Sequence, residues 1–320
     1  MGSLIRLMGK IVVFIFAILL IGGIIYFKKD IPPEKLIEKY ANADSKFMRL
    51  MGINVHYRDE GNPNDSLPLI LIHGTASSLL TWDSSVQLLK KQHRIIRFDL
   101  PGYALTGPNP EKDYGFDFYT RFVDSFINRL RISRCFLAGN SLGGGIAWHY
   151  TLAHAEKVAR LILVDASGYV NSIKPNGALG FKLAQIPVLN QLLKWITPRV
   201  IVKKSLEDVY GNHSKITAAL VDQYYDMLLR TGNRQAFIDR MRSGFGSSEE
   251  SDKIKEINTP TLIIWGEKDG LIPVENAYLF QRDIPNSRLE ILKGVGHVPM
   301  EEEPKRFAQI VSAFLLSKPL

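Results

Sequence analysis

The sequence has almost no cysteine, because Cys135 stands alone among 320 residues. A single cysteine excludes an internal disulfide framework and any metal site built on a Cys-x-x-Cys pair. Because Cys135 lies in an apolar run, residues 135–138, we interpret it as a core residue. Cysteine usage therefore gives no indication of the compartment, since proteins without disulfides occur on both sides of a membrane.

Long runs of one charge are also missing. The formal net charge is +8, from 40 lysines and arginines against 32 aspartates and glutamates. These basic residues are scattered, and no basic stretch is interleaved with aromatic side chains as nucleic-acid-binding segments often are. The charge therefore favours a solvated, mildly basic surface and no nucleic-acid partner.

One long uncharged run is present near the N-terminus, where residues 11–27 have the sequence IVVFIFAILLIGGIIYF. Its length just reaches the minimum of about 17 to 20 residues that a membrane-spanning helix needs. A cleaved signal peptide is the alternative, but its apolar region is shorter and ends in a small-residue cleavage site, which does not follow here. We predict a single-pass membrane anchor over residues 1–30. Basic residues flank both ends, so the side of the membrane stays open.

The rest of the chain, after a predicted linker at residues 31–46, alternates short apolar runs with amphipathic stretches. This alternation is typical of an α/β fold with a mostly parallel sheet and helices on both faces. Strands are predicted at residues 53–58, 69–72, 95–98, 135–138, 161–164, 262–265 and 289–292. Helices are predicted at residues 119–129, 142–154, 274–282 and 304–316.

The alternation breaks once, over residues 171–248. Apolar residues recur there at helical spacing, and no buried strand is evident. We therefore predict a helical cap, or lid, inserted into a core domain that comprises residues 47–170 and 249–320.

The residues Gly139-Asn140-Ser141-Leu142-Gly143 fit the pattern G-x-S-x-G between a predicted strand and a predicted helix. This is the context of a nucleophile elbow, a sharp turn that holds a serine hydroxyl clear of a sheet. Such a turn strains the serine backbone, and the flanking glycines let neighbouring chain approach. The following helix N-terminus favours developing negative charge. We predict that Ser141 is a nucleophile.

A serine hydroxyl needs a base that a third group orients. His297 follows the predicted strand 289–292 and Asp269 follows the strand 262–265, so both belong at the carboxyl edge of the sheet, where ligands bind. We predict a Ser141, Asp269, His297 triad in that chain order. Asp165 follows the strand 161–164 and is the alternative acid.

The loop after residues 69–72 is expected to complete the site. The backbone N–H groups of Thr75 and Leu142 are the predicted oxyanion hole, and His73 is expected to brace the loop that carries Thr75. This chemistry needs no metal and no organic cofactor.

From about Phe47 to the C-terminus, these motifs resemble the α/β-hydrolase superfamily, with His73-Gly74, Gly139 to Gly143, Asp269 and Gly296-His297 at the family's places. Residues 99–106, DLPGYALT, are similar to the family's D-x-P-G-x-G-x-S stretch, although Ala104 and Thr106 replace Gly and Ser. The resemblance implies the α/β-hydrolase fold. A serine nucleophile argues against the dehalogenases and epoxide hydrolases of this superfamily, which use Asp.

The resemblance further implies the cleavage of carboxylic esters. An anchor joined to such a domain looks like the membrane-anchored monoacylglycerol lipases and related bacterial lipases and esterases, which act on medium- to long-chain acyl esters. The same triad also serves carbon–carbon bond hydrolases of dienoic acids, thioesterases and perhydrolases. A non-turnover protein that only binds a small molecule is the alternative from another class.

The early part of the predicted cap, residues 179–196, is rich in large apolar residues with sparse lysines. It is either an ordinary cap helix packed on the core or a face that enters the lipid interface, with Lys182, Lys194, Lys203 and Lys204 near the headgroups. The membrane is thus an expected partner through residues 11–27 and, in the second interpretation, through the cap.

Overall fold

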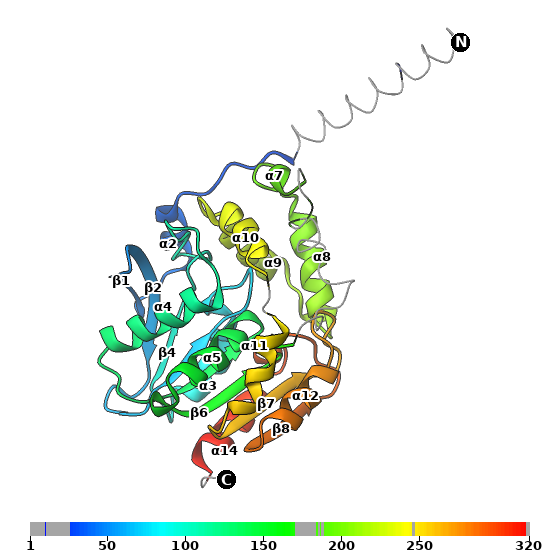
Figure 1. The fold of residues 1–320 in the computed structure, drawn as a ribbon. Helices are drawn as coiled ribbons and strands as arrows, with labels where there is room; N and C mark the ends of the chain where they lie inside the picture. The colour runs from blue at the N-terminus through cyan, green and yellow to red at the C-terminus, as the bar shows by residue number, and fades with distance from the viewer. Residues whose placement is uncertain are drawn as a thin grey trace.

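The computed structural model describes residues 10, 26–169, 184, 186, 189–244 and 247–317 (Figure 1). Most of the predicted membrane anchor, namely residues 1–9 and 11–25, lies outside these described residues. Among those that are described, no helix is both long and apolar enough to cross a membrane.

The described chain contains one sheet of eight strands, ordered β1-β2-β4-β3-β5-β6-β7-β8. The β1–β2 and β2–β4 pairs are antiparallel and all other neighbours are parallel, so the prediction of a mostly parallel sheet is confirmed. The strands are β1 (Ser45–Leu50), β2 (Ile53–Glu60), β3 (Leu69–Ile72), β4 (Ile95–Phe98), β5 (Cys135–Asn140), β6 (Val158–Val164), β7 (Thr261–Gly266) and β8 (Ser287–Leu292).

The central strands β3, β4, β5 and β7 are buried along their whole length because both faces of the sheet are covered. In β3, Ile70 and Ile72 pack into one hydrophobic cluster, whereas Leu69 and Leu71 pack into another. Successive side chains of a strand point to opposite faces, so these two clusters are the cores on either side of the sheet.

Helices cover each face. The first core includes side chains of α4 (Phe116–Arg129), α5 (Leu142–Ala153) and α12 (Glu275–Asp283). The second core includes side chains of α3 (Asp83–Leu89) and α14 (Pro304–Leu316). The α/β architecture predicted from the alternation is therefore confirmed. A short helix, α13 (Pro299–Glu302), precedes α14.

Between β6 and β7, the described residues from 189 to 244 form four α-helices, one short 3-10 helix (His213–Lys215) and no strand. His297, which follows β8, donates its backbone N–H to the carbonyl of Val209 at the end of the second helix (2.7 Å). The helices therefore cover the carboxyl ends of the strands, and they gather at one end of the sheet in Figure 1. They are α7 (Leu189–Leu193), α8 (Arg199–Val209), α9 (Ala218–Leu229) and α10 (Asn233–Arg242).

The limits of the cap, residues 171–248, stay a prediction. Residues 170–183, 185, 187–188 and 245–246 lie outside the part of the chain that the structure describes. A short helix, α11 (Ser248–Asp252), begins at the residue predicted to end the cap.

The interpretation of residues 31–46 as a linker was wrong. They contain helix α2 (Pro33–Tyr40), whose Leu36 is buried in the first core, and they run into β1. The helix is only eight residues long, shorter than the window of about 11 to 18 residues over which helical periodicity is read. The edge strand β1 went unpredicted for a similar reason, because most of its side chains are only partly buried.

Candidate active site

Ser141 lies at the turn between β5 and α5, as the elbow motif predicts. Its backbone has φ 56° and ψ −118°, a region that non-glycine residues rarely adopt. A side chain at Gly139 would meet the carbonyl oxygen of Gly143 at 2.0 Å, and one at Gly143 would meet that of Ile72 at 2.2 Å. Both glycines are therefore required by the close approach of neighbouring backbone. The strain at Ser141, typically about 1–3 kcal/mol, is imposed by this packing.

His297 and Asp269 meet at the carboxyl edge of the sheet. The Nδ1 atom of His297 lies 2.7 Å from Oδ2 of Asp269, and both side chains are buried. The other carboxylate oxygen, Oδ1, accepts hydrogen bonds from the N–H groups of Leu271 (2.7 Å) and Ile272 (2.9 Å). The acid is therefore fixed from both sides, and it favours the tautomer that carries the proton on Nδ1.

The elbow and the histidine loop are tied together. The Asn140 side chain, next to Ser141, donates to the carbonyl oxygens of His297 (3.0 Å) and Val164 (3.2 Å). Nε2 of His297 has no hydrogen-bond partner among the described residues. Serine–histidine hydrogen bonds are often long before substrate binds, so this arrangement leaves Nε2 available as a base.

Asp165, the alternative acid, lies directly beside this pair. A carboxylate oxygen of Asp165, a carboxylate oxygen of Asp269 and a ring nitrogen of His297 all lie within 4.8 Å of one another. Burial, followed by the charge of Asp269, raises the pKa of Asp165 well above its usual range, and its Oδ1 accepts the N–H of Gly266 (2.8 Å). Asp165 is thereby favoured in its neutral form, whereas Asp269 is the acid that hydrogen-bonds His297.

The predicted oxyanion loop packs onto the elbow. A side chain at Gly74 would lie 3.0 Å from Cβ of Ser141, which places Thr75 one residue from this contact. The N–H of Leu100 donates to Nε2 of His73 (2.9 Å), so Nδ1 of His73 carries the proton and donates it to the carbonyl of Gly74 (2.7 Å). Burial lowers the pKa of His73, which keeps it neutral in this bracing role. His73 thus holds the loop, as the sequence predicts.

Leu142, the other predicted donor, is the first residue of α5. Backbone N–H groups in the first turn of a helix have no partner within the helix. Leu142 is therefore placed to offer its N–H beside Ser141, with the positive end of the helix dipole behind it.

A second Ser-His-Asp arrangement lies elsewhere in the protein. Nε2 of His56 lies 3.0 Å from Oγ of Ser45, and Nδ1 lies 2.7 Å from Oδ2 of Asp99. Here the serine belongs to the edge strand β1 and also accepts a hydrogen bond from Arg58 (3.2 Å). None of these residues borders the cavity described below, so we interpret the arrangement as a structural polar cluster.

A residue that sequence reasoning missed joins the cap to the histidine loop. The carboxylate of Glu302, in α13, accepts the N–H groups of Gly296 (2.6 Å), Gly211 (3.1 Å) and Asn212 (2.9 Å). Gly211 and Asn212 follow α8, and Gly296 precedes His297. The only sequence signal was the run of three glutamates at 301–303, which does not reveal distant partners.

We expect Glu302→Gln to lower both stability and turnover. Its amide NH₂ would face backbone N–H groups in place of a carboxylate oxygen, and a buried donor without an acceptor costs about 1–3 kcal/mol. Thermal unfolding and kcat for a short soluble ester measure the two effects. The matched control is Glu303→Gln, because Glu303 pairs with Lys215 at the surface, where such pairs contribute about 0–1 kcal/mol. Equal losses in both variants would contradict the role of Glu302 in joining the cap to the histidine loop.

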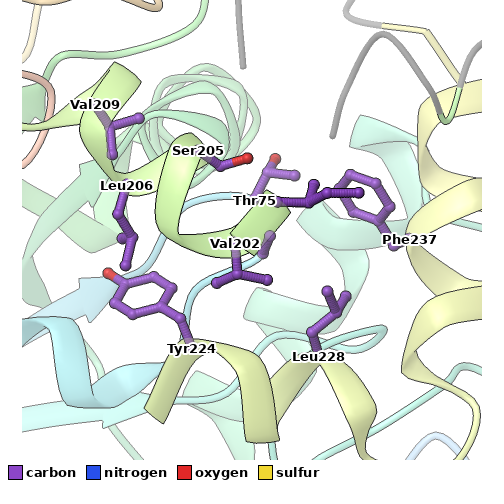
Figure 2. A pocket seen from close by; sticks show the side chains of 10 residues that line it. Thr75, Val202, Ser205, Leu206, Val209, Tyr224, Leu228 and Phe237 are labelled. Atoms are coloured by element: carbon purple, nitrogen blue, oxygen red, sulfur yellow. The ribbon is translucent and has the colours of Figure 1, made fainter. Parts of the chain in front are cut away.

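A cavity of about 120 Å³ lies beneath the cap helices, beside the loop that carries Thr75. Figure 2 shows side chains of α8, α9 and α10 converging on it, among them Val202, Leu228 and Phe237. None of its ten described lining residues carries a charge. The hydroxyl of Tyr224 is occupied by a hydrogen bond to Glu301 (2.5 Å). The cavity therefore suits an apolar group better than an anion.

The sheet order and the serine at the strand-to-helix turn are those of an α/β hydrolase, and comparison with known proteins confirms this class. Residues 68–304 match the family model described as "alpha/beta hydrolase fold". The chain belongs to the α/β-hydrolase family and is a hydrolase.

Three proteins illustrate what the chain is similar to. The "Uncharacterized hydrolase YugF" of Bacillus subtilis (strain 168) is 28% identical over 264 residues, which is 82% of this chain and 95% of the relative. The 2-hydroxy-6-oxo-6-(2'-aminophenyl)hexa-2,4-dienoic acid hydrolase of Metapseudomonas resinovorans is 27% identical over 290 residues, covering 88% and 94%. A solved structure named "putative lipase (lip1)" from Acinetobacter baumannii AYE superposes with a TM-score of 0.75 at 26% identity, covering 90% and 97%.

Proposed function

We propose that this hydrolase is a membrane-anchored serine esterase that cleaves medium- to long-chain acyl esters such as monoacylglycerols. Ser141 is the nucleophile, His297 the base and Asp269 the acid that orients it. Residues 11–27 supply the anchor.

In the proposed reaction, Nε2 of His297 takes the proton of the Ser141 hydroxyl as Oγ attacks the ester carbonyl carbon. Asp269 stabilises the imidazolium that forms. The N–H groups of Thr75 and Leu142 hold the oxyanion, each contributing about 3 kcal/mol in comparable sites. His297 then gives the proton to the leaving alcohol. In the second half of the reaction, His297 takes a proton from water as the water attacks the acyl-enzyme, and it returns this proton to Oγ of Ser141 as the carboxylic acid leaves.

The observation that carries the ester assignment is the uncharged, largely apolar cavity beside Thr75. An acyl chain is apolar and gains about 0.8 kcal/mol for each methylene it buries. The likeness to the structure named as a lipase supports the same substrate class.

Carbon–carbon bond hydrolysis is the second candidate, favoured by the similarity to a dienoic acid hydrolase. The substrate in that name is an acid, so its carboxylate needs a cation or several N–H donors once it is buried. The described lining of the cavity offers no lysine or arginine. This chemistry therefore supports the ester over the dienoate.

A substrate panel tests the proposal. p-Nitrophenyl esters of increasing chain length, a monoacylglycerol, an acyl-thioester and a 2-hydroxy-6-oxo-dienoate are compared at equal enzyme concentration. We expect kcat/KM for the esters to rise by up to about fourfold per methylene until the cavity is filled. A higher kcat/KM for the dienoate than for every ester would replace the proposal with the second candidate.

Narrowing the cavity provides a further prediction. Val202 is buried on α8 and lines the cavity. Val202→Phe should lower kcat/KM for a long-chain ester at least about tenfold while a butyrate ester is still cleaved, because only the longer chain needs the filled volume. Parallel loss of both activities would show that the acyl chain binds elsewhere or that the fold has suffered.

A further inference from the structure

Most of the exposed large apolar side chains of the described chain gather in two short segments. Nine such side chains occur among the described residues, and six of them lie at residues 26–27 and 186–200. We call these six the apolar patch: Tyr26, Phe27, Ile186, Leu192, Trp195 and Val200. Trp195 is 57% exposed and Val200 is 64% exposed. Exposed apolar side chains grouped in this way mark an interaction surface.

The two segments of the patch are joined to each other. The rings of Phe27 and Trp195 stack at a centroid distance of 6.0 Å and an interplanar angle of 6°. Phe27 forms an antiparallel bridge with Ile196, and the N–H of Lys28 donates to the carbonyl of Trp195 (2.9 Å). The chain that leaves the uncharged run 11–27 is thus attached directly to the junction of α7 and α8.

A buried arginine fixes the same stretch to the cap. Arg234, in α10, donates to Oδ1 of Asp30 (2.6 Å) and to the carbonyl of Lys28 (2.7 Å). Its side chain is only 4% exposed. If the anchor ends at residue 27, the residues that follow it directly are bonded to the cap, with no free linker between them.

The charges beside the patch that have no ion-pair partner among the described residues are basic. Lys28 and Lys29 are exposed, and Lys194 is half-buried beside Trp195. Within the described part of the chain these three lysines form no ion pair, whereas Lys203 and Lys204 pair with Glu207 and Asp208. Aromatic side chains flanked by lysines are typical of surfaces that contact anionic headgroups.

We infer that the apolar patch enters the headgroup region of an anionic bilayer and holds the cap against the lipid from which the substrate comes. The inference rests on the proposed anchor and ester hydrolysis, and it deepens them by naming the surface. Ile201 and Val202 line the cavity, and both follow Val200 of the patch on the first turn of α8. The patch therefore lies one residue from the wall of the acyl cavity.

The tryptophans make the surface measurable in the full-length protein. Of the four, Trp82, Trp148 and Trp265 are buried, and Trp195 alone is exposed. The whole chain is reconstituted into phosphatidylcholine–phosphatidylglycerol vesicles whose acyl chains carry bromine at a known depth. We expect the lipid to quench Trp195, at a depth of about 5–10 Å, and expect this quenching to vanish in Trp195→Phe.

A second measurement links the patch to substrate delivery. The triple variant Leu192→Ser, Trp195→Ser, Val200→Ser should hydrolyse a vesicle-borne monoacylglycerol about tenfold more slowly or worse, with a soluble butyrate ester still cleaved at the original rate. The matched control is Met51→Ser with Tyr278→Ser, which removes exposed apolar side chains of similar size (43% and 54% exposed) outside the patch. The control should retain both activities.

The outcomes separate the two proposals. If the unaltered chain does not cleave the soluble ester, the proposed function fails. If it cleaves the ester but lipid does not quench Trp195, the inference about the patch is overturned. Protection of Trp195 from both lipid and aqueous quenchers, lost on dilution, would assign the patch to a second copy of this chain instead.

Discussion

Ser141→Ala is expected to abolish ester hydrolysis and labelling by a fluorophosphonate probe. Ser141 is the serine held by the strained turn between β5 and α5, with the His297–Asp269 pair at the neighbouring strand ends. Removing the nucleophile of such a triad costs about 10⁶-fold in turnover, because the remaining residues cannot form the acyl-enzyme. Steady-state kinetics and gel-based detection of the labelled protein measure the loss.

The matched control for this prediction is Ser45→Ala. Ser45 also faces a histidine that is paired with an aspartate, but it lies on the edge strand β1 and not at an elbow. We expect the control to retain the label and most of its activity. If Ser141→Ala is still labelled, or if Ser45→Ala loses the label, the nucleophile is assigned to Ser45 instead.

Asp269→Asn is expected to lower kcat by about 10⁴-fold, the scale that this change produces in other Ser-His-Asp triads. The amide nitrogen would donate toward Nδ1 of His297, which favours the tautomer with the proton on Nε2. Nε2 then has no lone pair for the Ser141 proton. The fold should change little, since one amide oxygen can still accept the N–H groups of Leu271 and Ile272.

Asp165→Asn is the matched variant, one strand away in the same buried group. Burial and the Asp269 charge favour the neutral form of Asp165, and an amide resembles a neutral carboxyl in size and likewise offers an oxygen acceptor beside a donor. We expect kcat to fall by less than about tenfold. If the measured kcat is lower in Asp165→Asn than in Asp269→Asn, the assignment of the acid is reversed.

Much of the fold followed from local pattern. Strands β3 and β4 are buried on both faces, and they coincide with the predicted residues 69–72 and 95–98. The edge strand β1 was missed because its side chains are mostly only partly buried and show no clear alternation, and helix α2 was missed because it is only eight residues long. Sequence patterning reports burial, so it is strongest where burial is complete.

The candidate site divides in the same way. By itself the sequence determined the elbow around Ser141 and placed His297 and Asp269 after neighbouring strands, because strand ends and glycine turns are local features. Only the tertiary structure decided which acid contacts His297, since Asp165 and Asp269 both follow buried strands.

The connections between the core and the cap were likewise decided by tertiary structure alone. Glu302 reaches Gly211 across 91 residues, and Arg234 reaches Asp30 across 204. Such contacts depend on how distant segments pack, and neither the spacing nor the type of these residues encodes their partners. The sequence thus determined which side chains we predict to carry the chemistry, and the packing of the chain decided how the cap, the predicted anchor's end and the histidine loop are held together.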